Sequence, residues 1–139
     1  MGYKAPRTYT IVGTHTTVMS PVDATAYYIG GSAVAIAAGA ALRRIMIPKS
    51  GIIRSAQLTI YSSTADGTNE AWTVSLYDGT TTTAVAVVSA AVASRTWLNN
   101  NMNYPVTEGG YVQFVMTTPT WATNPDGCTC HYILVVEYE

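Results

Sequence analysis

Three residues near the C-terminal end carry the donor types of a zinc site: Cys128, Cys130 and His131. Zinc is bound by thiolates and imidazoles. In a β-strand, however, successive side chains point to opposite faces, so the imidazole of His131 would point away from both thiols. His15 is the only other histidine. The two thiols would lie roughly 6–7 Å apart on one face, a separation that does not favour a disulfide. We therefore predict two free, buried thiols and no metal site.

Carboxylates offer a second kind of chemistry. Residues 66–70 hold carboxylate and amide oxygens, which calcium prefers, but they lack the alternating ligand order of an EF-hand. A glycosidase needs two carboxyl groups about 5–10 Å apart across a cleft. Six of the eight acids of this chain instead fall in predicted turns and loops: Asp23, Asp66, Glu70, Asp78, Glu108 and Asp126. No G-x-S-x-G nucleophile elbow occurs either. The sequence therefore predicts no enzyme, no catalytic residue, no metal and no cofactor.

Aromatic side chains are the better candidates for binding. Trp97, Tyr104 and Trp121 lie in or beside predicted loops, where flat rings could stack on a sugar or anchor a protein contact. The alternative is that these rings cap the open end of the fold. Trp72 lies on the same face of its predicted strand as Val74 and Leu76 and is predicted to lie in the core. Ten tyrosines against one phenylalanine suit surfaces that are half buried at interfaces.

The N-terminal residues 1–21 are predicted to form an arm with one or two edge strands. Residues 8–12 and 15–19 are rich in threonine and prone to form strands, with Gly13 and Pro21 as breaks. Such an arm either frays or docks onto a neighbouring molecule. The side chains that would dock are two tyrosines and two cations: Tyr3, Lys4, Arg7 and Tyr9.

The rest of the chain, residues 22–139, is predicted to form one all-β domain. Residues 55–60 and 72–77 alternate between apolar and polar side chains, which is the period of half-buried strands. In the predicted strand at residues 111–117, Val112, Phe114 and Met116 form the inner face. The last run, residues 128–138, is apolar on both faces, which is typical of a central strand covered on both sides. Residues 33–42 are predicted to be extended or loop. About eight short strands with turn signals between them predict a single antiparallel β-sandwich of the jelly-roll type.

Composition limits the partners of this domain. The 139 residues are 48% apolar but only 11% charged, against roughly 25% charged in an ordinary soluble domain. A surface with so few charges repels neighbouring molecules only weakly, so we expect the chain to pack against copies of itself or another protein. A net charge of −1 predicts no general attraction for nucleic acid or for an anionic membrane. No apolar run approaches the roughly 20 residues of a transmembrane helix, and residues 1–20 do not read as a signal peptide. We expect the chain to be made and kept as a soluble cytosolic protein.

Residues 44–139 resemble small jelly-roll virion proteins of tailed phages. The elements that carry the resemblance are the corner at residues 48–51, the loop at residues 67–70, the turn at Gly109-Gly110 and the loop at residues 119–121. The resemblance implies a capsid decoration, or cement, protein that forms a homotrimer on the capsid surface of the virion and contacts the major capsid protein. The alternative within the same resemblance is the glycan- or receptor-binding head domain of a tail fibre or spike. Neither implies a catalytic residue set.

Overall fold

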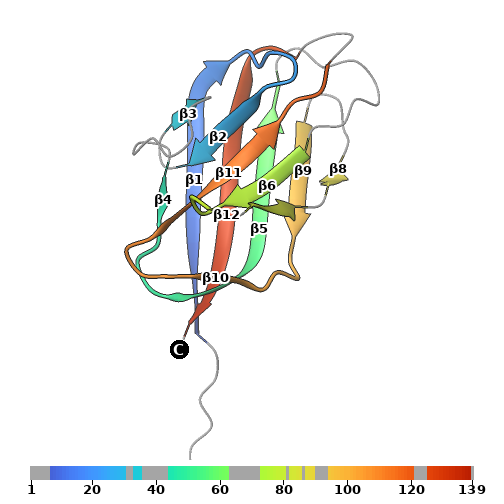
Figure 1. Cartoon of the computed structure of the whole chain (residues 1–139). Coiled ribbons are helices and arrows are strands. Elements are labelled where there is room, and N and C mark those ends of the chain that lie inside the picture. Colours follow the sequence, from blue (N-terminus) through green and yellow to red (C-terminus); the bar gives the residue numbers. More distant parts are fainter. Residues whose placement is uncertain are drawn as a thin grey trace, which may run out of the picture.

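Two antiparallel β-sheets pack face to face and enclose one hydrophobic core (Figure 1). The computed structural model describes residues 7–30, 33–35, 44–62, 73–80, 82–85, 87–89, 94–120 and 125–138. No helix occurs in these ranges, and hence none that is long and apolar enough to cross a membrane. The predicted all-β sandwich is confirmed.

Among the residues that the structure describes, each sheet contains six strands. The first sheet has the order β1 (Arg7–Met19), β12 (Cys128–Tyr138), β5 (Gly51–Tyr61), β9 (Ser94–Asn99) and β8 (Val87–Ser89), and β10 (Tyr104–Val106) also pairs with β5. The second sheet has the order β3 (Ala33–Ala35), β2 (Ala26–Gly30), β11 (Tyr111–Thr117), β6 (Thr73–Tyr77) and β7 (Thr82–Val85), and β4 (Ile45–Met46) also pairs with β11.

The strand order is that of a jelly roll. Eight of the described strands have four residues or more, and they run β1-β12-β5-β9 in one sheet and β2-β11-β6-β7 in the other. Of these eight strands, the first (β1) therefore pairs with the last (β12), and the second (β2) pairs with the seventh (β11). This is the order that results when a long hairpin is rolled into two sheets. This order agrees with the predicted jelly-roll type and with its count of about eight strands.

The alternation in the sequence identifies the inner faces correctly. Burying one large apolar side chain contributes about 1.5–3 kcal/mol, which is why these faces turn towards each other. The residues predicted to point inward are all buried where the structure describes them: Ala56, Leu58, Ile60, Val74, Leu76, Val112, Phe114 and Met116. Cys128 and Cys130 are buried and form no disulfide, as predicted, and burial raises the pKa of the Cys130 thiol to about 12, with a smaller contribution from Cys128.

Strand β12 lies in the middle of the first sheet, as predicted from the apolar residues on both of its faces. It lies between β1 and β5, and its inner side chains from Cys130 to Val136 are buried. Its outer side chains His131, Ile133 and Val135 are only half buried within this chain. One face of the strand is therefore covered by the second sheet, whereas the other remains partly open.

Two glycines allow the neighbours of β12 to approach closely. Gly13 on β1 faces Tyr132 on β12, and a Cβ atom at Gly13 would lie 2.1 Å from the Tyr132 ring. A Cβ atom at Gly51 would lie 2.3 Å from the backbone oxygen of Glu137. The predicted break at Gly13 does not interrupt the strand, because β1 continues as one edge strand to Met19.

Strand β9 was not predicted. The three asparagines at residues 99–101 favour a loop after Leu98. The polar residues Ser94 and Arg95 hide the alternation of apolar and polar side chains that would indicate a strand before this loop. In the structure β9 pairs with β5 over its whole length, which places Trp97 opposite Leu58 inside the core. Several predictions concern residues outside the described ranges: Trp72, the turn at residues 66–70 and most of residues 33–42.

We predict that Gly51→Ala destabilises the chain, because the added methyl group meets a backbone oxygen of β12 that cannot move without shifting the strand. The expected loss in the free energy of unfolding is about 1–3 kcal/mol, as for other overpacked sites. Denaturant unfolding followed by tryptophan fluorescence measures it. Ser55→Ala, on the outer face of the same strand, is the matched control and should change stability by less than about 0.5 kcal/mol. Equal stability of the two variants would contradict the close approach.

Candidate functional site

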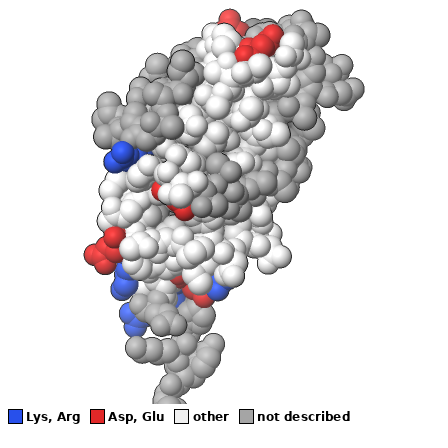
Figure 2. Space-filling model, viewed as in Figure 1, with Lys and Arg blue, Asp and Glu red and all other residues white. Residues whose placement is uncertain are grey.

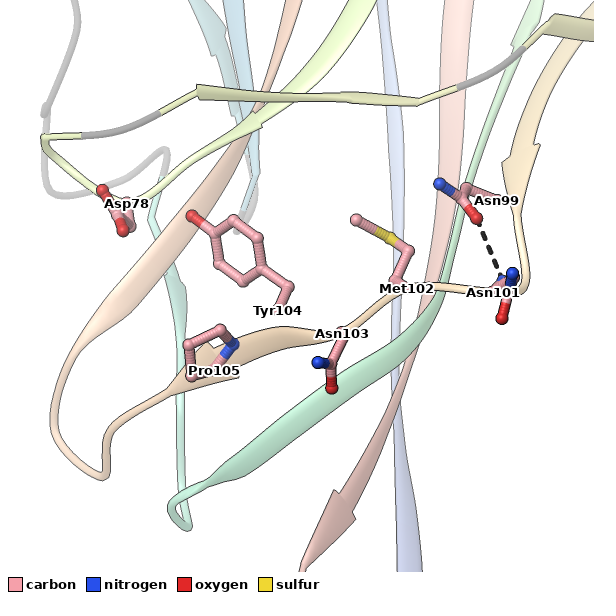
Figure 3. Close-up of a pocket in the computed structure, with 7 residues that line it drawn as sticks. All are labelled: Asp78, Asn99, Asn101, Met102, Asn103, Tyr104 and Pro105. Carbon is pink, nitrogen blue, oxygen red and sulfur yellow. Dashed lines mark hydrogen bonds between the residues drawn. The ribbon is translucent and has the colours of Figure 1, made fainter.

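A cavity of about 380 Å³ opens between the end of β6 and the connection from β9 to β10. Figure 3 shows the side chains that line it: Asp78, Asn99, Asn101, Met102, Asn103, Tyr104 and Pro105. Asp78 directly follows a strand of the second sheet, whereas the other six residues belong to the first sheet or its connection. The site is therefore assembled from both halves of the sandwich.

Two local turns fix the polar groups at either side of this cavity. The backbone N–H of Thr80 donates to Asp78 Oδ1 over 2.9 Å, and Gly79 between them has a φ of 97°, which glycine adopts without strain. On the opposite side, the backbone N–H of Asn101 donates to Asn99 Oδ1 over 3.0 Å (Figure 3). Aspartate and asparagine side chains favour such turns. The positions of Asp78 and Asn99 thus follow from short-range sequence.

Arg54 ties the β9–β10 connection to β5. Its backbone oxygen accepts a hydrogen bond from the N–H of Met102 over 3.0 Å, and its Nη1 donates to Asn103 Oδ1 over 2.8 Å. Its Nη2 also forms an ion pair with Glu137 Oε1 at 3.2 Å. A single side chain therefore anchors the loop to the two long strands β5 and β12.

Tyr104 forms the buried wall of the cavity. Its side chain is 6% exposed, and its hydroxyl points towards Asp78 (Figure 3). Burial raises the pKa of the Tyr104 hydroxyl above its usual value, and the negative charge of the nearby Asp78 carboxylate raises it further. The hydroxyl therefore stays protonated above the pH at which an exposed tyrosine ionises.

A second cavity, of about 280 Å³, adjoins the first. Asp78 and Pro105 line both, and Thr80, Thr107 and Tyr111 are among the other residues that line the second cavity. The ring of Tyr111 is held from another side by the guanidinium carbon of Arg44, which lies 4.4 Å from the ring centre. We call the two cavities together the Asp78 groove.

The structure separates the three aromatic residues that the sequence singled out. Tyr104 lies in the wall of the groove, as described above. Trp97 has 0% exposure and packs in the core, which corrects its assignment as an aromatic residue for ligands or partners. The ring cannot meet a ligand because its strand pairs with β5 and turns it inward. Trp121 lies outside the described residues.

The predicted docking residues at the N-terminus are only partly described. Arg7 is exposed at the start of β1, and Tyr3 and Lys4 lie outside the described residues. The half-buried Tyr9 packs against the core, and its hydroxyl donates to the backbone oxygen of Lys49 over 2.6 Å. Tyr9 therefore serves contacts within the chain, while docking of this segment stays a prediction.

Asp78 and the asparagines of the groove were not recognised as site residues from the sequence. The local signal was present, since Asn99, Asn100, Asn101 and Asn103 crowd into five positions. The distance from Asp78, more than 20 positions along the chain, hid their juxtaposition. His131 lies on the outer face of β12, opposite Cys128 and Cys130, and its Nδ1 lies 3.0 Å from Thr14 Oγ1. Within the described ranges, no three metal-ligating side chains of the His, Cys, Asp and Glu types cluster.

Comparison with known proteins gives similarity of fold. No family model and no curated protein sequence matches the chain. A chain in the capsid asymmetric unit of cyanophage Pam1 is similar with a TM-score of 0.53 and 14% sequence identity, over 100% of this chain and 91% of that chain. The crystal structure of FLHE gives a TM-score of 0.49 and 10% identity, over 98% of this chain and 99% of that chain. At this identity, the capsid chain shares the fold of the sandwich.

We predict that Tyr104 makes stability fall at high pH. The folded chain holds the Tyr104 proton above pH 10.0, the unperturbed pKa, whereas the unfolded chain releases it. The free energy of unfolding therefore decreases as pH rises above about 10, where the unfolded state binds fewer protons. In Tyr104→Phe this decrease should be shallower. Denaturant unfolding from about pH 8 to about pH 11 measures it, with Tyr61→Phe at an exposed position as the control. An unchanged slope in Tyr104→Phe would contradict the assignment.

Proposed function

We propose that the chain is a non-enzymatic structural protein of a phage particle, which oligomerises on the head and stabilises it by contacting the major capsid protein. The observation that carries the proposal is the likeness in fold to a chain of the cyanophage Pam1 capsid unit, which covers the whole of this chain. The sequence resemblance to small jelly-roll virion proteins supports the same role independently. Such a role requires no catalysis, no cofactor and no nucleic acid or membrane as partner.

The outer face of the first sheet suits permanent contact with protein. One row of paired residues across β1, β12, β5 and β9 consists of Val12, Ile133, Gln57 and Leu98. The neighbouring row consists of Thr14, His131, Thr59 and Thr96, with hydrogen bonds of 3.0 Å between the side chains of its first two and its last two members. Neither row contains a carboxylate, lysine or arginine. This face presents little charge that would oppose association.

The other side of the molecule carries charges at several places. Figure 2 shows them at the top of the face seen in Figure 1, along its left side, at its lower end and, for one acidic group, near its middle. At one end of the first sheet, Arg54 and Glu137 neutralise each other. The outer face of the first sheet can therefore contact a neighbouring subunit, while the other side of the domain contacts another protein.

We assign the outer face of the first sheet to contacts within a homotrimer. Val12 is 57% exposed, although it is large and apolar, and it lies in line with half-buried Ile133. A specific interface buries about 800 Å² per partner, an area that a sheet face of this kind can supply. Binding of the trimer only to the assembled shell would then stabilise the shell by mass action.

A second candidate role is the glycan- or receptor-binding head domain of a tail fibre or spike. The Asp78 groove favours it, because a concave site with convergent polar groups is typical of ligand binding. Decoration of the head remains the first proposal, because the likeness to the capsid chain covers the entire domain.

We predict that the purified chain is a trimer by light scattering and that Val12→Lys converts it to a monomer, because three buried ammonium groups would meet in the interface. Val22→Lys is the matched control, since Val22 is 55% exposed and lies in the connection to β2, away from the outer face. It should leave the trimer intact. Heads purified from the encoding phage without this gene should bind the wild-type chain and Val22→Lys in sedimentation assays. A monomeric wild-type chain that also fails to bind heads would contradict the proposal.

A further inference from the structure

The Asp78 groove is preformed in the ligand-free chain. The turn at Asp78, the turn at Asn99 and the bonds from Arg54 to the loop fix its polar walls through hydrogen bonds of 2.8–3.0 Å. A cavity whose groups are held in place loses little conformational entropy on binding. The first cavity, at about 380 Å³, falls within the range of roughly 300–1,000 Å³ for small-molecule sites.

The polar groups of the groove suit hydroxyl groups. Asn103 and Asn99 each use the side-chain oxygen within the chain, which leaves their amide nitrogens to donate. The exposed side chain of Asn101 offers both a donor and an acceptor, and Asp78 contributes a carboxylate where the two cavities meet. A sugar hydroxyl both donates and accepts, so neighbouring hydroxyls can pair with carboxamides and a carboxylate at once.

The charge of the groove favours a neutral ligand over an anion. None of the described residues that line either cavity is lysine or arginine, and Asp78 is the only charged one. Phosphate groups and acidic sugars would meet the negative charge of this carboxylate in both cavities. A neutral ligand meets no such penalty.

Apolar surfaces lie beside these polar groups. Tyr104, Met102 and Pro105 line the first cavity, and Tyr111 lies at the far side of the second. Aromatic and apolar side chains of this kind can cover the C–H faces of a sugar ring. Because Asp78 and Pro105 are common to both cavities, one ligand can occupy the two in succession.

We infer that the Asp78 groove binds a neutral oligosaccharide, with one sugar unit in the cavity at Asn101 and the next in the cavity at Tyr111. This inference does not depend on whether the chain sits on the head or on a fibre. An oligosaccharide is favoured over a peptide because three carboxamides and a carboxylate line the groove at close spacing beside its apolar residues. The asparagine amides and Asp78 would bind hydroxyls, and Tyr104 with Pro105 would support the ring.

The test uses the full chain on an array of immobilised neutral and sialylated oligosaccharides, followed by NMR titration with each neutral oligosaccharide that is retained. The expected result is binding of neutral oligosaccharides, with amide shifts confined to residues 78–80, 99–107 and 110–112. Asn101→Ala should weaken binding about tenfold, the effect of losing one net hydrogen bond. Asn100→Ala is the matched control, because Asn100 is exposed in the same loop and does not line the groove. It should bind like the wild type.

Both variants should show the wild-type melting temperature, so that a loss of binding reports on the groove. Absence of binding to every neutral oligosaccharide would overturn the inference. A preference for sialylated oligosaccharides, shifts elsewhere on the chain or equal losses in the two variants would also overturn it. Binding of random displayed peptides that depends on Asn101, without saccharide binding, would reassign the groove to peptides.

Discussion

The structure depends on the placement of β12 between β1 and β5. The last strand of the chain must pair with the first, from Arg7 opposite Tyr138 to His15 opposite Cys130, and with β5 on its other side. These pairings join the two ends of the described part of the chain, so the first sheet cannot close before the C-terminal residues are available. The pairings also need the close approach at Gly13 and Gly51.

The same pairing creates the groove. Between Val135 and Val136 the register shifts, so that Arg54 on β5 becomes the extra residue of a β-bulge. Freed from regular pairing, Arg54 reaches Glu137 on one side and Asn103 on the other, and its backbone oxygen holds Met102. Bulges often redirect a side chain next to a functional site. The irregularity in the central strand pair therefore fixes the loop that forms one wall of the Asp78 groove.

The sequence alone predicted the strands in which apolar and polar side chains alternate. The inner faces of β5, β6 and β11 follow from a period of two, and the double apolar character of residues 128–138 predicted a central strand. Strand β9 escaped prediction because Arg95, a buried charged side chain, occupies an inward position beside Trp97. The groove escaped prediction for a different reason. Asp78 and Asn99 belong to elements of different sheets, and only the jelly-roll order brings them together.

The proposed role rests on a domain whose first sheet has a weakly charged outer face and whose fold is shared with a capsid chain. The most direct test is a cryo-electron microscopy comparison of heads from the encoding phage with and without the gene for this chain. The account predicts additional density on the outer surface of the complete heads, fitted by three copies of the sandwich around a local three-fold axis. Identical head surfaces in the two preparations, or density for the chain only at the tail tip, would contradict it.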